Sequence, residues 1–215
     1  MIKKIRASNL EKIIFTFIVV LAIFFFVYFF LIKDKCLFIK SYDPQKINFD
    51  NPKNIAILNV TCGNVIIELY PDTSPEAVKR FKELVRSKAY DNIAFHRVIK
   101  DTLVQAGDLE FGKKGNIDYG KIGTGKSGLG TINSEIDTPF NFSKGSVGLA
   151  RTQNYNTEDS QFFIILRDEP LYETEYTPIG KVIYGLKALG KIKYSDRSQY
   201  VLRPDFINTF YMLEK

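Results

Sequence analysis

The only histidine in the chain, His96, stands next to an arginine in the stretch FHRVIKDTLVQAGD at residues 95–108. An imidazole exchanges a proton near neutral pH, whereas a guanidinium stays charged and presents rigid N–H donors. Phe95 and Val98 flank the pair in a β-rich run, so we expect His96 to pack in the interior with a hydrogen bond to the backbone. Arg97 is then the residue of this stretch that could take part in a reaction.

Chemistry that needs a nucleophile or a metal has little support in this sequence. Ser160 lies in EDSQFF, which is not the sharp turn of a nucleophile elbow, and a catalytic triad would have to use the single histidine. Cys36 and Cys62 have neither metal-ligand spacing nor a partner histidine nearby. The sequence therefore predicts no metal site and no cofactor.

One glycine-rich stretch matches the pattern of a phosphate-binding loop. GKIGTGKS, Gly120 to Ser127, fits G-x-x-x-x-G-K-[ST], but that motif holds a nucleotide only between a buried strand and a helix. The preceding GKKGNIDY is no buried strand and the following GLGTINSE cannot start a helix promptly, so we predict a surface loop and no nucleotide. The net charge of +6 is scattered along the chain, which argues against a nucleic-acid partner.

The N-terminal region carries the clearest physical signal. Residues 13–32, IIFTFIVVLAIFFFVYFFLI, form an uncharged run of 20 residues, the length of a helix that crosses a bilayer. No small-residue cleavage site follows, which favours an uncleaved anchor over a signal peptide. Basic residues flank the run: Lys3, Lys4, Arg6 and Lys12 before it, and Lys33, Lys35 and Lys40 after it. With the free amine, they favour a cytoplasmic N-terminus at residues 1–12 and a domain on the far, extracytoplasmic side of the membrane.

A polar segment with two prolines, residues 33–53, is predicted to link the anchor to a folded domain at residues 54–215. We expect Cys36 and Cys62 to stay unpaired, because the first lies just outside the membrane and the second at a strand end.

Short β-rich runs dominate the domain. Two of them surround Gly63-Asn64, a hairpin signal. A helix is predicted to begin after Ser74, a capping residue, with Pro75 in its first turn, and a second short helix is expected at residues 186–192. Further strands are expected at residues 94–99, 147–150, 162–166, 177–183 and 206–213. Many short strands and few helices favour a mostly β fold, a closed antiparallel barrel capped by helices.

Two stretches, FHRVIKDTLVQAGD and GSVGLARTQNYNTEDSQFFIIL, together resemble the cyclophilin family of peptidyl-prolyl cis-trans isomerases, the second most closely its bacterial members. The likeness extends from about Ile55 to the C-terminus, through SPEAVKRFKELV, GTGKSG and YTPIGKVIYGL. It implies an eight-stranded antiparallel barrel with two helices over its ends. It also implies prolyl isomerase activity on proline-containing polypeptides.

The resemblance assigns roles to individual residues. Arg97 falls on the family's catalytic arginine, and Gln105 and Gln161 fall on glutamines that orient the substrate or the arginine. Phe163 matches the aromatic floor of the proline pocket. Arg97, Gln105 and Phe163 are the expected catalytic group, and Gln161 is expected to bind the substrate.

The expected substrate-binding residues include several departures from the family pattern. Leu103 and Leu171 match apolar walls of the pocket, and Tyr176 stands where others carry histidine at the rim. Thr102 replaces a phenylalanine that in most members packs on the proline ring; such a ring contributes about 1.5–3 kcal/mol when buried. The edge that contacts the substrate backbone matches Ala150, Arg151 and Thr152.

The reaction explains why no triad is needed. Amide resonance gives rotation about the peptide bond a barrier of ~18–20 kcal/mol, and no bond is made or broken in the isomerisation of X–Pro. A dry pocket for the proline ring and a fixed donor at the prolyl nitrogen suffice, and Arg97 is the expected donor. Two alternatives stay open: a non-catalytic module that binds proline peptides in a pocket altered at Thr102, and a nucleotide-binding protein that uses residues 120–127.

Overall fold

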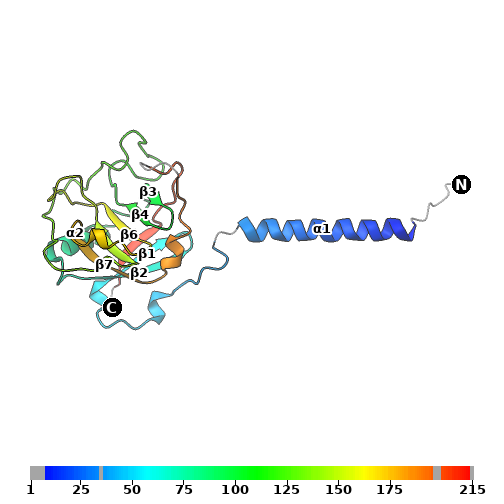
Figure 1. Cartoon of the computed structure of the whole chain (residues 1–215), viewed down its shortest axis with the longest axis horizontal. Coiled ribbons are helices and arrows are strands. Elements are labelled where there is room, and N and C mark those ends of the chain that lie inside the picture. Colours follow the sequence, from blue (N-terminus) through cyan, green and yellow to red (C-terminus); the bar gives the residue numbers. More distant parts are fainter. Residues whose placement is uncertain (1–7, 34–35, 196–199, 214–215) are drawn as a thin grey trace. The chain divides into compact units, whose positions relative to one another are not determined.

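The computed structural model describes residues 8–33, 36–195 and 200–213 and contains two compact units, Met1–Phe38 and Ile39–Lys215 (Figure 1). Of the basic residues used to predict the orientation of the anchor, Lys3, Lys4, Arg6 and Lys35 lie outside the described residues.

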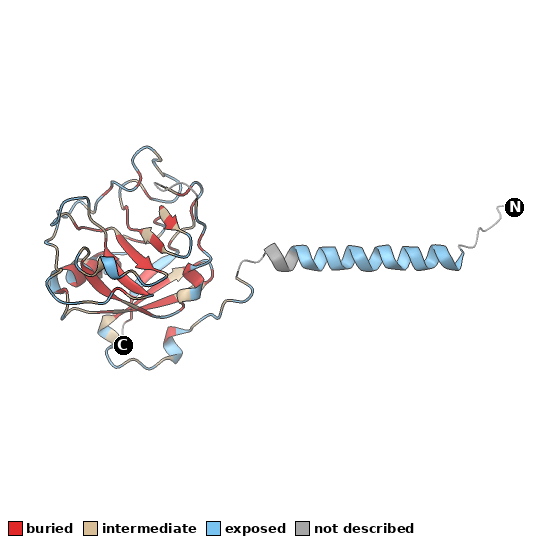
Figure 2. Cartoon of the chain, viewed as in Figure 1, coloured by how far each residue is buried: buried red, intermediate tan, exposed pale blue. Residues whose placement is uncertain are grey.

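The first unit is dominated by a single apolar helix, α1, Asn9–Lys33. Ser8 and Glu11 form a reciprocal cap at its start: the Ser8 N–H donates to Glu11 Oε2 at 2.6 Å, and the Glu11 N–H donates to Ser8 Oγ at 3.2 Å. The side chains from Asn9 to Phe29 are exposed all round the helix (Figure 2). At 1.5 Å per residue the helix is about 38 Å long, enough to cross a bilayer, although a signal sequence near an N-terminus meets the same criteria.

The second unit begins earlier than the predicted domain boundary. The chain from Ile39 belongs to it, because Tyr42, Ile47 and Phe49 pack against buried core residues. That part of the core consists of Ile55, Ile57, Ile66 and Leu213. Two 3-10 turns, Pro44–Lys46 and Pro52–Asn54, lie in the same segment. Most of the segment predicted as a linker is thus part of the folded domain.

The expectation that the two cysteines stay unpaired is wrong. Cys36 and Cys62 are both disulfide-bonded. The expectation treated the chain before residue 54 as a free spacer, whereas it is folded onto the domain from Ile39, three residues after Cys36.

Eight antiparallel strands form one sheet in the order β3-β4-β6-β5-β7-β2-β1-β8. The strands are β1 Ile55–Val60, β2 Gly63–Leu69, β3 Arg97–Ile99, β4 Leu103–Ala106, β5 Ser146–Leu149, β6 Phe162–Ile165, β7 Pro178–Tyr184 and β8 Thr209–Met212. The first hairpin turns at Thr61-Cys62, because Val60 pairs with Gly63 and Asn59 with Asn64. The predicted hairpin is confirmed, but its turn precedes Gly63-Asn64, which begin β2.

The predicted barrel of eight antiparallel strands is confirmed except that it is not closed by a strand ladder. Among the described residues, β3 and β8 at the two ends of the sheet are joined only indirectly, through the isolated bridge between Ala94 and Phe206. Single hydrogen bonds continue this seam, from the Phe95 N–H to the Asp205 carbonyl at 3.0 Å and from the Ile207 N–H to the Ile93 carbonyl at 2.9 Å. Pro204 lies at this seam, and a proline cannot donate to a ladder.

Two helices accompany the sheet, as expected: α2, Pro75–Arg86, and the short α3, Leu186–Leu189. Ser74 occupies the capping position of α2, but its hydroxyl makes no hydrogen bond with any described residue. Instead the carboxylate of Glu135 accepts the N–H groups of Glu76 at 3.2 Å and Ala77 at 2.8 Å. A carboxylate there stabilises the positive end of the helix dipole.

The buried face of α2 rests on an aromatic cluster in the core. Phe81 contacts Tyr90, Phe162 and Phe210, with ring centroids 5.4 to 5.5 Å apart. The Tyr90 hydroxyl donates to the carbonyl of Ser160 at 2.8 Å. This packing fixes β6, which contains Phe163, and the residue before it, Gln161 (Figure 2 shows the buried strands).

Candidate active site

A chain of hydrogen bonds connects three of the predicted site residues. Arg97 pairs with Gln105 across β3 and β4, and Gln105 pairs with Phe163 across β4 and β6. Because paired residues project to the same face, the side chains meet: Arg97 Nη1 donates to Gln105 Oε1 at 3.2 Å. Gln105 Nε2 in turn donates to Gln161 Oε1 at 3.0 Å.

The chain ends on the glycine-rich loop. Gln161 Nε2 donates to the carbonyls of Gly123 and Gly125, each at 3.0 Å. We call Arg97, Gln105, Gln161 and residues 123–125 the polar half of the site. The guanidinium is thus held by side chains that are themselves fixed to backbone, which is what a preorganised donor requires.

Asp108 holds this loop and was given no role by the sequence analysis. It is fully buried, and its carboxylate accepts the N–H groups of Phe111 at 2.8 Å, Gly123 at 2.6 Å and Gly125 at 3.1 Å. Gly125 is required because a Cβ there would overlap the carboxylate. The sequence did contain a signal for Asp108, which is the last residue of the Q-A-G-D motif.

An aromatic cluster forms the other side of the site. Leu103 and Phe163 are 2% and 4% exposed, and both pack with Phe142, whose ring stacks on Phe163 at 6.2 Å. Gly148 lies beneath them, where a Cβ would come within 2.6 Å of Phe163 Cζ. The predicted floor and one predicted wall are therefore brought together.

Two tyrosines cover Phe163 from the loop that follows β6. The rings of Tyr172 and Tyr176 meet the Phe163 ring edge-on, with centroids 5.7 and 5.0 Å away. We call Leu103, Phe163, Tyr172 and Tyr176 the apolar half of the site. Burial is the main reason that the pKa of the Tyr172 phenol is raised, and the Arg97 charge acts against it.

Leu171 does not occupy the place expected of a pocket wall. Its side chain is 83% exposed, whereas its neighbour Tyr172 is the residue that contacts Phe163. Both belong to the 3-10 turn Pro170–Tyr172, in which successive side chains point in different directions. The resemblance to the family placed the wall at Leu171, one residue before the side chain that contacts Phe163.

Ala150 borders the apolar half, and Thr102 directly precedes Leu103 in the sequence. Thr102 is partly buried in the turn between β3 and β4, and its hydroxyl donates to the Lys100 carbonyl at 3.2 Å. Ala150 packs against the cluster around Phe163.

Arg151 is rigidly held beside Tyr176. Its guanidinium lies over the rings of Tyr155 at 4.2 Å and Tyr176 at 5.2 Å, and Nη2 forms an ion pair with Glu175 at 2.6 Å. Thr152 follows, with its N–H donated to Thr157 Oγ1 at 3.0 Å. A pocket of about 210 Å³ lies between residues 150–152 and the loop at residues 123–126.

His96 packs in the interior, as expected. It is 1% exposed. Within the described residues neither ring nitrogen makes a hydrogen bond of good geometry, but the Ala94 backbone and the Gln161 side chain both lie close enough to affect its pKa. Burial lowers the pKa of His96 to about 4, with Asp108 raising it and Arg97 lowering it. The imidazole is therefore neutral at pH 7.

Arg97 borders open space. A pocket of about 400 Å³ is lined by Arg97, His96 and Gln105 on one side and by Tyr119 and Tyr200 on the other. The partly buried guanidinium thus faces a cleft at the edge of the polar half.

The groups that nucleophilic catalysis or phosphate binding would need already form hydrogen bonds within the fold. The Ser160 hydroxyl is buried and donates to the Gly107 carbonyl at 2.8 Å. The Gly123 and Gly125 N–H groups of the phosphate-loop pattern bond to Asp108. Among residues 8–33, 36–195 and 200–213, no group of three potential metal ligands is present.

The family model described as cyclophilin type peptidyl-prolyl cis-trans isomerase matches residues 55–210. A protein of Brucella suis biovar 1, named as a probable peptidyl-prolyl cis-trans isomerase, is 42% identical over 167 residues, which cover 76% of this chain and 84% of that protein. A peptidyl-prolyl cis-trans isomerase of Dictyostelium discoideum is 33% identical over 136 residues, covering 63% of this chain and 81% of that protein.

A solved structure agrees in fold. The crystal structure of a cyclophilin type peptidyl-prolyl cis-trans isomerase of Cryptosporidium parvum, in the presence of the dipeptide Ala-Pro, aligns with a TM-score of 0.64 and 26% identity. The alignment covers 75% of this chain and 99% of that one.

Proposed function

The chain belongs to the cyclophilin family of peptidyl-prolyl cis-trans isomerases, and from that premise we propose that Arg97 is the catalytic group and that the domain acts outside the cytoplasm. The observation that carries the first part is the chain of hydrogen bonds from Arg97 through Gln105 and Gln161 to the loop at residues 123–125. It fixes a permanent positive charge beside an apolar cluster.

In the proposed mechanism the proline ring of the substrate packs against Phe163, with Leu103 and Tyr172 excluding water. As the X–Pro bond twists, resonance is lost and the prolyl nitrogen regains its lone pair. Arg97 donates an N–H to that lone pair, which is present in the twisted state and not in either planar isomer. The interaction therefore favours the transition state over both ground states, as catalysis requires.

The substrate backbone lies along Ala150, Arg151 and Thr152 in this proposal. Arg151 is held between two tyrosines and by Glu175, so it presents a rigid edge rather than a mobile charge. Gln161 stands between this edge and the Arg97 chain, because it lines the pocket beside residues 150–152 and also bonds to Gln105.

We place the domain on the extracytoplasmic side of a membrane, with α1 as an uncleaved anchor and the N-terminus in the cytoplasm. The flanking lysines and arginines support this orientation. The disulfide-bonded state of Cys36 and Cys62 supports it independently, since disulfides persist in oxidising compartments. There the enzyme assists the folding of proteins with exposed X–Pro bonds, and protease accessibility in intact cells and in cells with a permeabilised outer membrane tests the placement.

The activity is tested with a prolyl-peptide assay on the full chain in detergent micelles. Arg97→Ala is expected to lower kcat/KM about 10²–10³-fold, the usual effect of removing one preorganised donor. Arg167→Ala, which removes an exposed arginine paired with Glu169, serves as the control and should retain wild-type turnover.

A proline-peptide-binding module without turnover is the second candidate. The observation in its favour is that Phe163 is 4% exposed and covered by Tyr172 and Tyr176, at a site where Thr102 replaces the usual ring. Peptide binding by the wild type with no turnover would establish this candidate and overturn the role of Arg97.

A further inference from the structure

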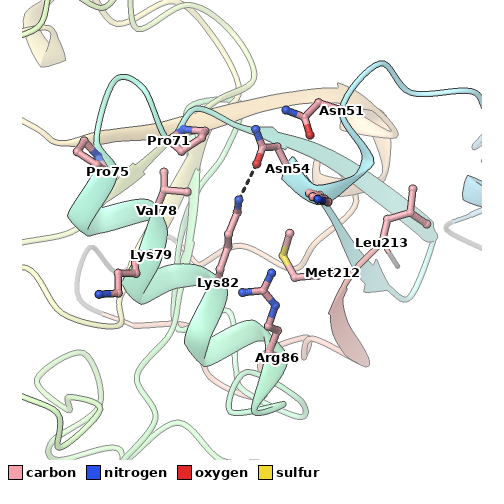
Figure 3. A pocket seen from close by; sticks show the side chains of 11 residues that line it. Asn51, Asn54, Pro71, Pro75, Val78, Lys79, Lys82, Arg86, Met212 and Leu213 are labelled. Atoms are coloured by element: carbon pink, nitrogen blue, oxygen red, sulfur yellow. Dashed lines mark hydrogen bonds between the residues drawn. The ribbon is translucent and has the colours of Figure 1, made fainter. Parts of the chain in front are cut away.

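A pocket of about 650 Å³ lies outside the active site, between α2, the segment at residues 51–54 and the end of β8 (Figure 3). Its apolar floor includes Val78, Met212 and Leu213. The volume is in the range of pockets that take small molecules, so the site accommodates more than a single inorganic ion.

The charged groups of this pocket all have one sign. Lys53, Lys79, Lys82 and Arg86 line it, and the described lining holds no carboxylate. Three of them recur along one face of α2, and like charges at this spacing destabilise a helix. Within the described part of the chain, none of the four has an acidic partner in an ion pair.

Lys82 lies deepest among these cations. It reaches from α2 toward the segment at residues 51–54, where Nζ donates to Asn54 Oδ1 at 2.6 Å, and Arg86 lies one turn further along the helix, near Met212 (Figure 3). Burial, and next the charge of Arg86, lower the pKa of Lys82. The neutral amide oxygen leaves the positive charge uncompensated.

Arg80, on a different face of the same helix, differs from these cations because it has an acidic partner. Arg80 forms a buried ion pair with Asp159 at 2.8 Å and also donates to the carbonyl of Gly130 at 2.7 Å. Arg80 therefore has its counter-charge within the fold, whereas Lys79, Lys82 and Arg86 have none.

We propose that this pocket is a binding site for a phosphate-bearing ligand. Four cations around one hollow favour a group that carries more than one negative charge, and lysine binds phosphate as a point charge. The apolar floor receives the uncharged part of the ligand. The same chemistry is offered by an anionic phospholipid headgroup and by a soluble phosphate ester.

The test uses the full chain in nanodiscs, whose bilayer holds α1 in every arm. Inorganic pyrophosphate is titrated calorimetrically into neutral phosphatidylcholine discs. In parallel, amide hydrogen exchange of residues 75–86 is compared between discs with and without phosphatidylglycerol. Heat of binding in the first arm assigns the site to soluble phosphates, and protection of α2 in the second assigns it to lipid headgroups.

The triple variant Lys79→Gln, Lys82→Gln and Arg86→Gln is expected to weaken binding about tenfold or more, since even one hydrogen bond to a charged group contributes about that factor. Lys82→Arg, which keeps the charge, should retain most of it. The matched control is Lys144→Gln, Lys187→Gln and Lys191→Gln, which removes the same charge from exposed positions outside the pocket.

Thermal unfolding of each variant verifies that it is folded. The proposal is overturned if the wild type gives neither heat nor protection, or if the control loses as much binding as the pocket variant. Isomerase activity does not enter the readout, so the outcome is independent of the role proposed for Arg97.

Discussion

The polar half and the apolar half of the active site are built on different kinds of backbone. Arg97, Gln105 and Gln161 lie on or beside strands whose register brings their side chains together. Tyr172 and Tyr176, which complete the apolar half, lie on the irregular loop after β6. The strand-borne half is locked by hydrogen bonds of 3.0 to 3.2 Å, while the loop-borne half is held by ring contacts.

The difference matters for function. A donor must be aimed at one atom, and strands with a fixed register provide that precision. A clamp for a proline ring needs mainly to be apolar and to open and close, and ring contacts on a loop permit both. We therefore expect changes in the polar half to affect stability or turnover strongly, and changes in the apolar half to act more weakly, on substrate binding.

Removal of the Asp108 carboxylate should have the largest effect. Asp108→Ala leaves three buried or partly buried N–H groups without their acceptor, and each lost bond to a charged group costs about 1.5–3 kcal/mol. The free energy of unfolding is expected to fall by roughly 4 kcal/mol or more in denaturant titrations. Asp118→Ala is the control on the same loop, because its carboxylate is half exposed, accepts one backbone N–H, that of Gly120, and otherwise forms an exposed ion pair with Lys121 at 4.0 Å. If both variants lost the same free energy of unfolding, the Asp108 carboxylate would not be what holds the loop of the polar half.

The neutral, buried His96 predicts a pH dependence of stability. Its pKa is about 4 in the folded protein against 6.5 ordinarily, so below pH 6.5 the unfolded chain binds a proton that the folded chain does not. Stability should therefore fall as the pH drops from about 6.5 to 4, by up to about 3 kcal/mol, and then level off. Unfolding of wild type and His96→Gln across this range measures it. A variant with the same slope as the wild type would assign the dependence to other groups.

Tyr172 and Leu171 provide the sharpest test of the apolar half. Tyr172→Ala is expected to lower kcat/KM about tenfold, mainly through KM, because the ring that covers Phe163 is lost. Leu171→Ala should stay within about twofold of the wild type, since that side chain is exposed. The reverse ranking would restore the wall first expected at Leu171.

Thr102→Phe should have the smallest effect and the opposite sign. A ring at this position adds apolar contact to the bound proline, and about 1 kcal/mol of such contact raises kcat/KM roughly fivefold. Thr102→Val separates the loss of the hydroxyl from the gain of the ring. If Thr102→Phe binds and turns over peptides no better than Thr102→Val, the turn before β4 does not face the substrate.

The two halves also differ in how far the sequence predicted them. Arg97, Gln105, Gln161 and Phe163 were identified through the resemblance to the cyclophilin family, and the register of the strands that carry or flank them then brings their side chains together. Leu171 was misplaced because a 3-10 turn has no such alternation, and a shift of one residue changes which side chain points inward.

Long-range partners were the other gap. The barrel and both helices were predicted from short β-rich runs and capping signals, but nothing local shows that Glu135 rather than the Ser74 side chain caps α2. The packing of Tyr42, Ile47 and Phe49 on the core was likewise hidden, since these residues are dispersed in a polar segment. Both contacts depend on where distant segments meet after folding.

The central claim, that Arg97 stabilises the twisted X–Pro bond, is tested most directly by NMR exchange spectroscopy on a proline peptide bound to the full chain in micelles. This measurement reports the affinity for the peptide and the rate of cis–trans exchange on the enzyme separately. Arg97→Ala is predicted to bind the peptide within about threefold of the wild type while on-enzyme exchange slows about 100-fold. Exchange at the wild-type rate in the bound variant would contradict the account.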